Sequence, residues 1–163
     1  MAIQSISTGL FDTPVTWTAD WAWGLPLIVL IVLLHVLGLA MTREAALRIF
    51  DLSSQRHPIV VFVIVTGTAT FLATCLHAIE ATIWAIAYVV LGAMPNYRMA
   101  MLYSLNAMTS YGHTNLALAD HWHLMGAIEA LNGWILFGLT TAFLFGVIDK
   151  VWSVEKGFKR SAT

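Results

Sequence analysis

The chain has 163 residues, of which 59% are hydrophobic and only 10% are charged. Soluble domains carry about 25% charged residues, and a chain of this length cannot bury so much apolar surface in one globule. A soluble enzyme is therefore excluded early, and the net charge of −1 offers no basic field for nucleic acid. The single cysteine excludes an intrachain disulfide framework. The composition predicts a protein whose main partner is the lipid bilayer.

Three apolar stretches are long enough to cross a hydrocarbon core of about 30 Å. They are Gly24–Met41, Pro58–Leu91 and Leu124–Val151. The second is so long that it either tilts strongly or crosses by about His77 and continues in the outer interface. Between the second and third, Met99–Ala119 is rich in Ser, Thr, Asn and Tyr, which suits a lipid-facing span poorly. We expect an all-α membrane protein with three transmembrane helices.

The basic residues predict the orientation. Only Arg98 lies between the second and third spans, and the other seven flank the opposite ends of the spans: Arg43, Arg48, Arg56, Lys150, Lys156, Lys159 and Arg160. By the positive-inside rule that side is cytoplasmic. We therefore expect a multi-pass protein of the inner (plasma) membrane, with its N-terminus outside and its C-terminus in the cytoplasm. Met1–Ile6 lacks the basic start of a cleavable signal peptide. Arg43–Arg56 predicts either a short amphipathic interfacial helix or a solvated linker.

The polar segment Tyr103–Asn115 is the part of the sequence suited to ion chemistry. Polar backbone at membrane depth is tolerated only where it is buried in protein or lines an aqueous cavity. Here Arg98–Ser110 predicts a short helix, and Tyr111–Leu116 predicts an extended strand that contains Gly112. A re-entrant helix followed by such a strand can present backbone carbonyls to a dehydrated ion.

Ser104–Leu116 resembles the pore segment of the two-transmembrane potassium-channel pore family, whose usual form is S-L-x-T-x-T-T-V-G-Y-G-D. Residues 110–114, Ser-Tyr-Gly-His-Thr, take the positions of T-V-G-Y-G, and Asn115 takes that of the acid. The resemblance covers about Gly67–Val151, over half of the chain.

Further residues carry the same resemblance. Gly133, Gly138 and residues 139–142 (Leu-Thr-Thr-Ala) are similar to the family's inner helix. His77–Glu80 and Gly126–Glu129 resemble a proteobacterial subgroup of such channels.

The resemblance implies a potassium-channel-like homotetramer, because one pore segment per chain cannot close a ring. It divides the chain into an N-terminal segment with an extra transmembrane helix and a cytoplasmic linker (1–57), a channel-like pore module (58–152) and a cytoplasmic tail (153–163). It implies a cation channel for monovalent cations, potassium-selective or weakly selective, with K⁺ as a permeant ion and no cofactor. No Ser/His/Asp triad, phosphate loop or closed metal motif points to an enzyme.

The site residues that the resemblance implies fall into three groups. The ion filter is formed by Thr109, Ser110, Tyr111, Gly112, His113 and Thr114. The cavity and gate are formed by Gly133, Trp134, Phe137, Thr141 and Phe145, where Phe145 is a candidate apolar constriction, Gly133 or Gly138 a candidate hinge, and packing or lipid contact the alternative. Because acids that face lipid are costly, we expect Glu80 and Glu129 to support the filter from behind through hydrogen bonds to the pore helix, with ion coordination as the alternative.

Two departures from the family pattern bear on function. Thr114 replaces the second filter glycine, and His113 replaces the signature tyrosine. The resulting segment is more similar to the T-I-G-E-T filter of weakly selective cyclic-nucleotide-gated cation channels. A non-conducting, channel-like membrane sensor or scaffold is therefore the alternative function. Fourfold symmetry would also place four His113 imidazoles around one axis, where protonation would repel cations.

Other histidines leave two further hypotheses open. His121 and His123, with Asp120, form either an exposed polar turret or a zinc or copper site together with His113. His35 and His77 suggest a membrane cytochrome with two haem ligands. They lie toward the middle and the outer end of their spans, so that only an offset of the helices would pair them.

Overall fold

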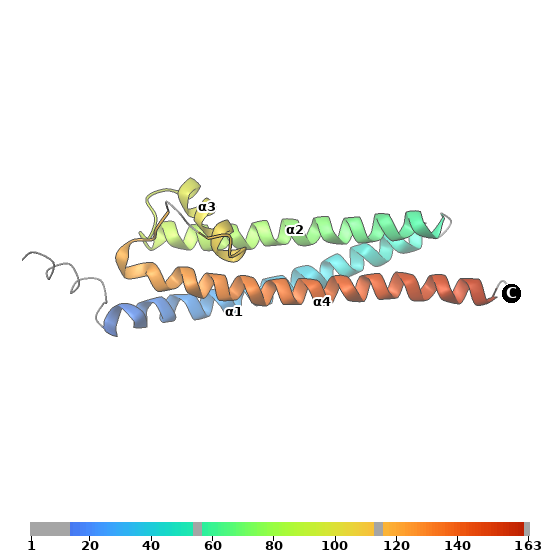
Figure 1. Ribbon diagram of the computed structural model, residues 1–163, viewed down its shortest axis with the longest axis horizontal. Coiled ribbons are helices and arrows are strands. Elements are labelled where there is room, and N and C mark those ends of the chain that lie inside the picture. Colours follow the sequence, from blue (N-terminus) through green and yellow to red (C-terminus); the bar gives the residue numbers. More distant parts are fainter. Residues whose placement is uncertain (1–13, 54–56, 113–115, 162–163) are drawn as a thin grey trace, which may run out of the picture. The chain divides into compact units, whose positions relative to one another are not determined.

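The computed structural model describes residues 14–53, 57–112 and 116–161 (Figure 1). Its elements are α1 (Pro14–Ser53), α2 (Pro58–Val90), α3 (Tyr97–Met108), the 3-10 helix η1 (Asp120–Trp122) and α4 (His123–Ser161). Among these residues there is no strand, so the all-α prediction is confirmed.

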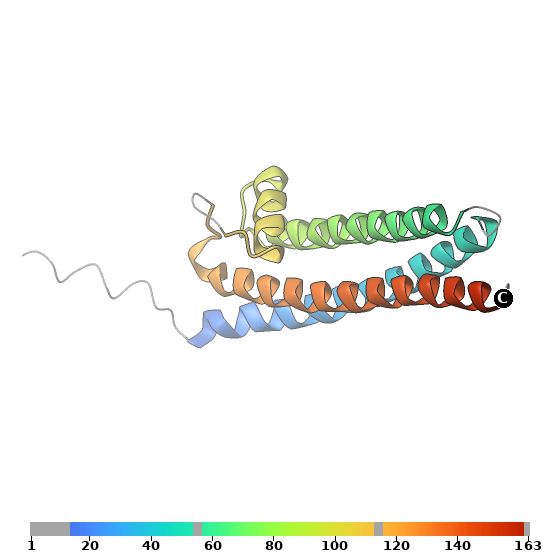
Figure 2. The same ribbon diagram turned by 45° about the vertical axis from the view of Figure 1, so that its right-hand side comes forward.

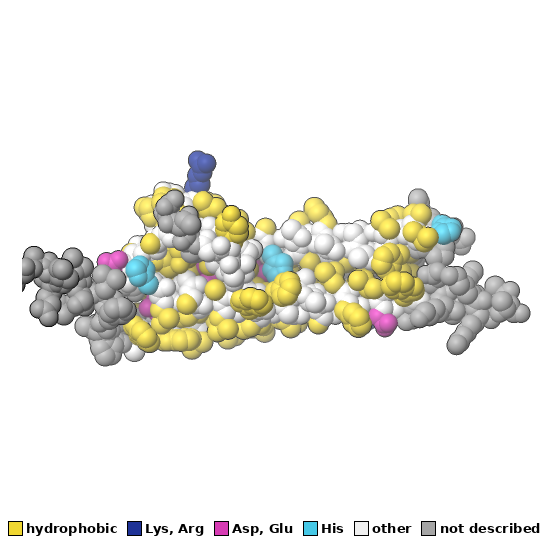
Figure 3. Space-filling view, viewed as in Figure 1, with side chains coloured by type: hydrophobic (Ala, Val, Ile, Leu, Met, Phe, Trp, Pro, Cys, Tyr) yellow, Lys and Arg dark blue, Asp and Glu magenta, His cyan; other side chains and the backbone are white. Residues whose placement is uncertain are grey.

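Three of the helices are long and apolar enough to cross a membrane, over Trp17–Leu52, Ile59–Val90 and Asp120–Trp152. They also expose large apolar side chains, such as Leu33 and Phe71, to more than half of their area. Hydrophobic side chains spread over the face in Figure 3, where charged ones are few. Such a surface is suited to lipid tails rather than water. The prediction of a membrane protein with three long spans is thereby confirmed.

Two local predictions need correction. α1 runs through Arg43 to Ser53 without a break, so the stretch after the first apolar run is neither a separate helix nor a linker. The strand expected over Tyr111–Leu116 does not form at residues 111, 112 or 116, and residues 113–115 lie outside the described residues. The short helix expected over Arg98–Ser110 is found as α3, within two residues at each end.

The structure divides into two compact units. We call the described residues 14–32, 80–112 and 116–134 the α3 part, and residues 33–53, 57–79 and 135–161 the histidine part. Each of the three long helices contributes to both.

In the α3 part, α3 lies beside the last turns of α2 and the first turns of α4 (Figures 1 and 2). Trp84, Tyr88 and Met125 are fully buried there. Gly24 of α1 faces Ile128 of α4, and a Cβ on this glycine would lie 2.8 Å from the isoleucine side chain. The absence of a side chain at this position therefore allows the two helices to approach closely.

In the histidine part, three helices share one apolar cluster: Ala46, Val61, Val65, Ala69, Val147 and Val151. Ala46 of α1 packs with Val147 and Val151 of α4, while His35 bonds to Thr140. Residue numbers thus rise together along α1 and α4, so these helices run in the same direction here. α2 runs in the opposite direction, since Val65 packs with Val147 in the cluster and His77 bonds to Thr140.

Candidate functional site

A buried polar cluster in the α3 part fixes α3 to both of its neighbours. Ser104 of α3 lies 2.5 Å from one carboxylate oxygen of Glu129 on α4, and its Oγ also lies 2.9 Å from the Ala81 carbonyl of α2. The Tyr88 hydroxyl donates to the other oxygen of Glu129 at 2.6 Å. Ser104 and Glu129 are both fully buried. One carboxyl group therefore joins α2, α3 and α4, and both of its buried oxygens have hydrogen-bond partners.

Tyr103 packs beside this cluster, with its ring edge-on to Tyr88 at 5.4 Å between centroids. Burial, followed by the negative charge of Glu129, raises the pKa of the Tyr103 phenol to about 12. The phenol is therefore neutral at physiological pH. Gly126 makes room for it, because a Cβ there would collide with the Tyr103 hydroxyl.

Contacts along α3 show how far each of its ends lies along α4, measured from the first residue of α4. Ser104 reaches Glu129, six residues into α4, and the Met108 backbone lies where a Cβ on Gly133 would have to be. The Trp134 indole then bonds to the Ser110 hydroxyl at 3.0 Å. At a rise of 1.5 Å per residue, the chain moves from about 9 Å to about 16 Å along α4. The C-terminal end of α3 is therefore the deeper end.

After this descent the chain returns. The backbone N–H of Ala119 donates to the carbonyl of Ala93, just after α2, at 3.0 Å. His123 donates from Nε2 to the Leu118 carbonyl at 2.8 Å, at the first residue of α4. The segment thus begins and ends at the same end of the α3 part.

The end of α3 is closed by a Schellman motif. Ser110 N–H donates to the Ala107 carbonyl and Tyr111 N–H to the Asn106 carbonyl, each at 3.0 Å. Ser110 lies in the left-handed region with a φ of 53°, where glycine is the usual residue. Gly112 follows with a φ of 90°. This turn is the physical reason why the expected strand does not start at Tyr111.

Of the described residues expected to form the filter, Ser110 is placed about 16 Å along α4 by its bond to Trp134. The Thr109 hydroxyl donates to the Leu105 carbonyl at 2.7 Å. The Tyr111 side chain is 84% exposed. Among the described residues, the backbone carbonyls of residues 109–112 accept no hydrogen bond. His113 and Thr114 lie outside the described residues.

The residues expected to form the cavity and gate share one exposed face of α4: Trp134, Phe137, Thr141 and Phe145. The two candidate hinge glycines differ. Gly133 is buried against the Met108 backbone, whereas a Cβ on Gly138 would meet nothing within 4 Å. Packing within the chain therefore requires a glycine at position 133 but not at position 138.

The two acids expected behind the filter are both fully buried. Glu129 bonds to α3 through Ser104, whereas Glu80 lies on α2, one residue before Ala81. A third buried polar group, Asn132, lies next to Gly133. Neither of its amide atoms has a hydrogen-bond partner within the described residues.

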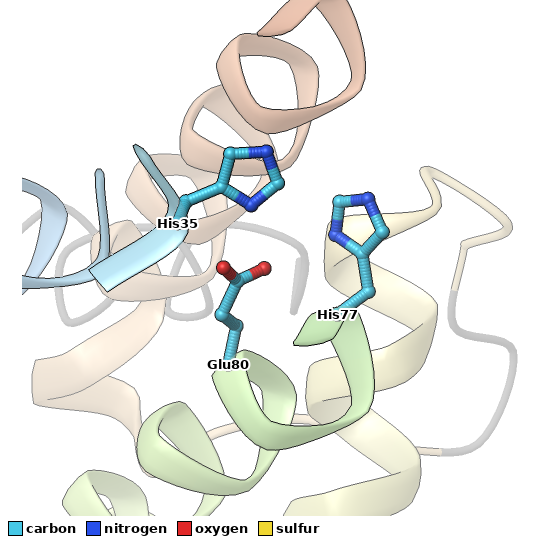
Figure 4. Close-up of side chains that lie close together, drawn as sticks. All are labelled: His35, His77 and Glu80. Carbon is cyan, nitrogen blue, oxygen red and sulfur yellow. The ribbon is translucent and has the colours of Figure 1, made fainter. Parts of the chain in front are cut away.

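A second polar cluster, in the histidine part, joins His35, His77 and Thr140. The Thr140 hydroxyl lies 3.1 Å from Nε2 of His35 and 3.0 Å from Nε2 of His77. The two rings are turned toward each other, with centroids 5.2 Å apart (Figure 4). A hydroxyl carries one proton, so it can donate to at most one of the two Nε2 atoms, and at least one of the rings donates to it from Nε2.

This pairing corrects the expected offset of the two histidines. His35 lies 18 residues before the end of α1, and His77 lies 19 residues after the start of α2. Counted from the turn that joins the helices, both are at the same height. The apolar stretches gave a different answer because α1 extends well beyond its apolar run. Counting residues from the turn between the two helices, instead of from the ends of the apolar runs, would have placed the two histidines at the same height.

The geometry also bears on the metal and haem hypotheses. The Thr140 hydroxyl lies between the two Nε2 atoms, where a haem iron would have to bind, so the pair does not fit a bis-histidine haem. A metal ion would need further ligands, and Glu80 lies one helical turn beyond His77 on α2 (Figure 4). Of the turret residues, His123 is 3.9 Å from Asp120 and already donates to a carbonyl.

Comparisons of the chain with protein-family models, curated proteins and solved structures found no match.

Proposed function

We propose that the chain forms a homotetrameric channel for monovalent cations, with α3 as its pore helix and residues 109–114 as its filter. The observation that carries the proposal is that, within the described part of the chain, the carbonyls of residues 109–112 accept no hydrogen bond and directly follow the deeper end of α3. Carbonyl oxygens can replace the hydration shell of a cation without placing a full charge in the bilayer.

The depth of the segment supports this reading. Ser110 lies about 16 Å along α4 from its first residue, and half of a hydrocarbon core is about 15 Å. If α4 enters the bilayer near its first turn, the carbonyls lie near the midplane. Irregular backbone at that depth is stable only against protein or water. Four copies around an axis would supply both.

The polarity of α3 supports a cation rather than an anion. The negative end of a helix dipole is its C-terminus, and this end is the deeper one. The last turn of α3 contains no basic residue that would cancel it. The neutral Tyr103 and the hydrogen-bonded Glu129 place no cation beside the segment either.

The proposed tetramer places its contacts on the exposed apolar faces of α3 and α4, which lipid tails would cover in a single copy. Met99, Leu102 and Leu105, at every third position of α3, expose 37%, 52% and 40% of their area. On α4, Trp134, Phe137 and Phe145 expose more than 60% each. A second copy would cover such faces with matching apolar surface.

The test is a flux assay on the purified chain in vesicles of phosphatidylethanolamine and phosphatidylglycerol, with native mass spectrometry of the same sample. We expect a tetramer that passes Rb⁺ or Tl⁺ above protein-free vesicles. Gly112→Ala would strain the loop at a φ of 90° and abolish the flux, while Gly67→Ala, where a Cβ meets nothing within 4 Å, would preserve it. A monomer, or a folded tetramer that passes no monovalent cation, would overturn the proposal, and the latter would favour the non-conducting sensor or scaffold.

A further inference from the structure

A cavity of about 230 Å³ lies in the histidine part, between α1 and α4 with Val65 of α2 at its side. Its wall is largely apolar, and small residues such as Ala142 and Gly146 create the hollow. A Cβ built on Gly146 meets nothing within 4 Å. The charged side chains in its wall are both cations: Arg43 from α1 and Lys150 from α4.

The two cations lie at nearly the same depth. Arg43 follows His35 by eight residues on α1, and Lys150 follows Thr140 by ten residues on α4. Because His35 and Thr140 are hydrogen-bonded and the helices run in the same direction, both cations lie about 12–15 Å beyond the histidines. Lys150 follows the first residue of α4 by 27 residues, about 40 Å along the helix, which is beyond a hydrocarbon core of about 30 Å that begins near the first turn. The positive-inside rule assigns this end to the cytoplasmic side.

The apolar wall extends from the cations back toward the histidines. Ala142, Phe143 and Gly146 follow Thr140 by two, three and six residues, so this wall covers about 3–9 Å from the histidine layer. The cavity therefore combines an apolar channel near the cytoplasmic edge of the hydrocarbon core with a cationic end at the expected headgroup level.

Neighbouring acids do not remove this charge from the cavity wall. Glu44 lies 3.6 Å from Arg43, but both side chains are more than half exposed, and such pairs contribute little. Asp149 precedes Lys150 on α4 and is exposed, and it does not belong to the cavity wall. Two like charges on one cavity favour an anion between them.

We propose that this cavity binds one anionic phospholipid of the cytoplasmic leaflet. Its phosphate lies between Arg43 and Lys150, and an acyl chain lies along Ala142, Phe143 and Gly146. Basic pockets between transmembrane helices on the cytoplasmic side bind anionic headgroups for the same reason. The proposal does not depend on conduction, since every residue in it belongs to the histidine part.

The test is native mass spectrometry of the full chain in detergent, titrated with phosphatidylglycerol or with phosphatidylcholine of the same acyl chains. We expect tighter binding of phosphatidylglycerol. Arg43→Gln and Lys150→Gln should each weaken it about fivefold, the factor that corresponds to about 1 kcal/mol per basic residue at an anionic surface. Arg48→Gln is the matched control, because Arg48 is exposed on α1 and is not part of the cavity wall.

A second variant tests the acyl chain separately. Gly146→Leu fills the hollow without removing a charge, so it should reduce phosphatidylglycerol binding as strongly as either charge variant. Glycerol phosphate, the soluble headgroup, should compete only weakly, and competition at equal concentration would show a site for free phosphate instead. Equal binding of both lipids, or unchanged binding in the Arg43 and Lys150 variants, would overturn the proposal. A filling variant that changes the oligomeric state but not lipid binding would show that a second copy occupies the cavity.

Discussion

Ser104 on α3 and Glu129 on α4 form a buried hydrogen bond of 2.5 Å. The other oxygen of the same carboxylate accepts from Tyr88 on α2. One acid on α4 thus fixes the position of α3 relative to both α2 and α4. This relationship sets the depth of α3, and through it the depth of the carbonyls that follow.

Replacing Glu129 should loosen α3. Glu129→Ala removes the close acceptor of the buried Tyr88 hydroxyl and leaves Ser104 with the Ala81 carbonyl alone, at a cost of about 1–3 kcal/mol for an unsatisfied group. Glu129→Gln keeps one oxygen acceptor and should cost less. Thermal unfolding in detergent measures the difference, and equal melting temperatures for the two variants would contradict the role assigned to the carboxylate.

Gly133 should tolerate no side chain. A Cβ there would lie 2.8 Å from Cα of Met108, and backbone atoms cannot move aside as a flexible side chain can. Gly133→Ala should therefore displace the end of α3, lower the melting temperature and abolish ion flux. Gly138→Ala is the matched control on the same helix, since its Cβ meets nothing within 4 Å. If both variants behave like the unchanged chain, the close contact of α3 with α4 is wrong.

Two small substitutions at Ser110 should differ in stability. Ser110→Gly removes the strain of a left-handed φ, worth about 1–2 kcal/mol, but also removes the hydroxyl that bonds to Trp134. Ser110→Ala removes the same hydroxyl and keeps the strain. Glycine should therefore be the more stable of the two by about 1 kcal/mol, as measured by unfolding in detergent. A more stable alanine variant would refute the left-handed turn.

Thr140 and Thr141 offer a matched pair in the histidine part. Thr140→Val preserves shape but removes the hydroxyl that His35 and His77 share, and it should cost about 1–3 kcal/mol. Thr141 donates only to the Phe137 carbonyl of its own helix, at 2.8 Å. Thr141→Val should therefore leave the melting temperature nearly unchanged. A similar loss in both variants would mean that the shared hydroxyl has no special role.

If the chain conducts as proposed, cation flux should fall as external pH drops through about 6.5, the unperturbed pKa of histidine. Protonation of His113 in four copies would place a ring of positive charge at the pore. The measurement is flux against external pH, with His113→Tyr expected to remove the dependence and His121→Gln expected to keep it. A pH dependence that survives His113→Tyr would assign the effect to another group.

The sequence predicted the helices well because their signals are local. Apolar runs define the three spans, and the polar run after Asn96, whose side chain caps Met99, defines α3. The hydrogen bond of Glu129 to the short helix could be expected because an acid against lipid is costly. The contacts of Trp134 with Ser110, and of Gly133 with Met108, depend on how two helices are placed against each other, which no local pattern encodes. The height of His35 relative to His77 was misjudged because apolar stretches were counted instead of whole helices.

The shared height of the two imidazoles has a consequence for the lengths of the helices. Both histidines lie nearly the same number of residues from the turn that joins α1 and α2. One residue inserted between this turn and either histidine would rotate that imidazole about the helix axis by about 100° and shift it along the axis by about 1.5 Å. Thr140 could then reach only one of them. Substitutions along these two segments can be absorbed one at a time, but an insertion or deletion in one segment requires a compensating change in the other.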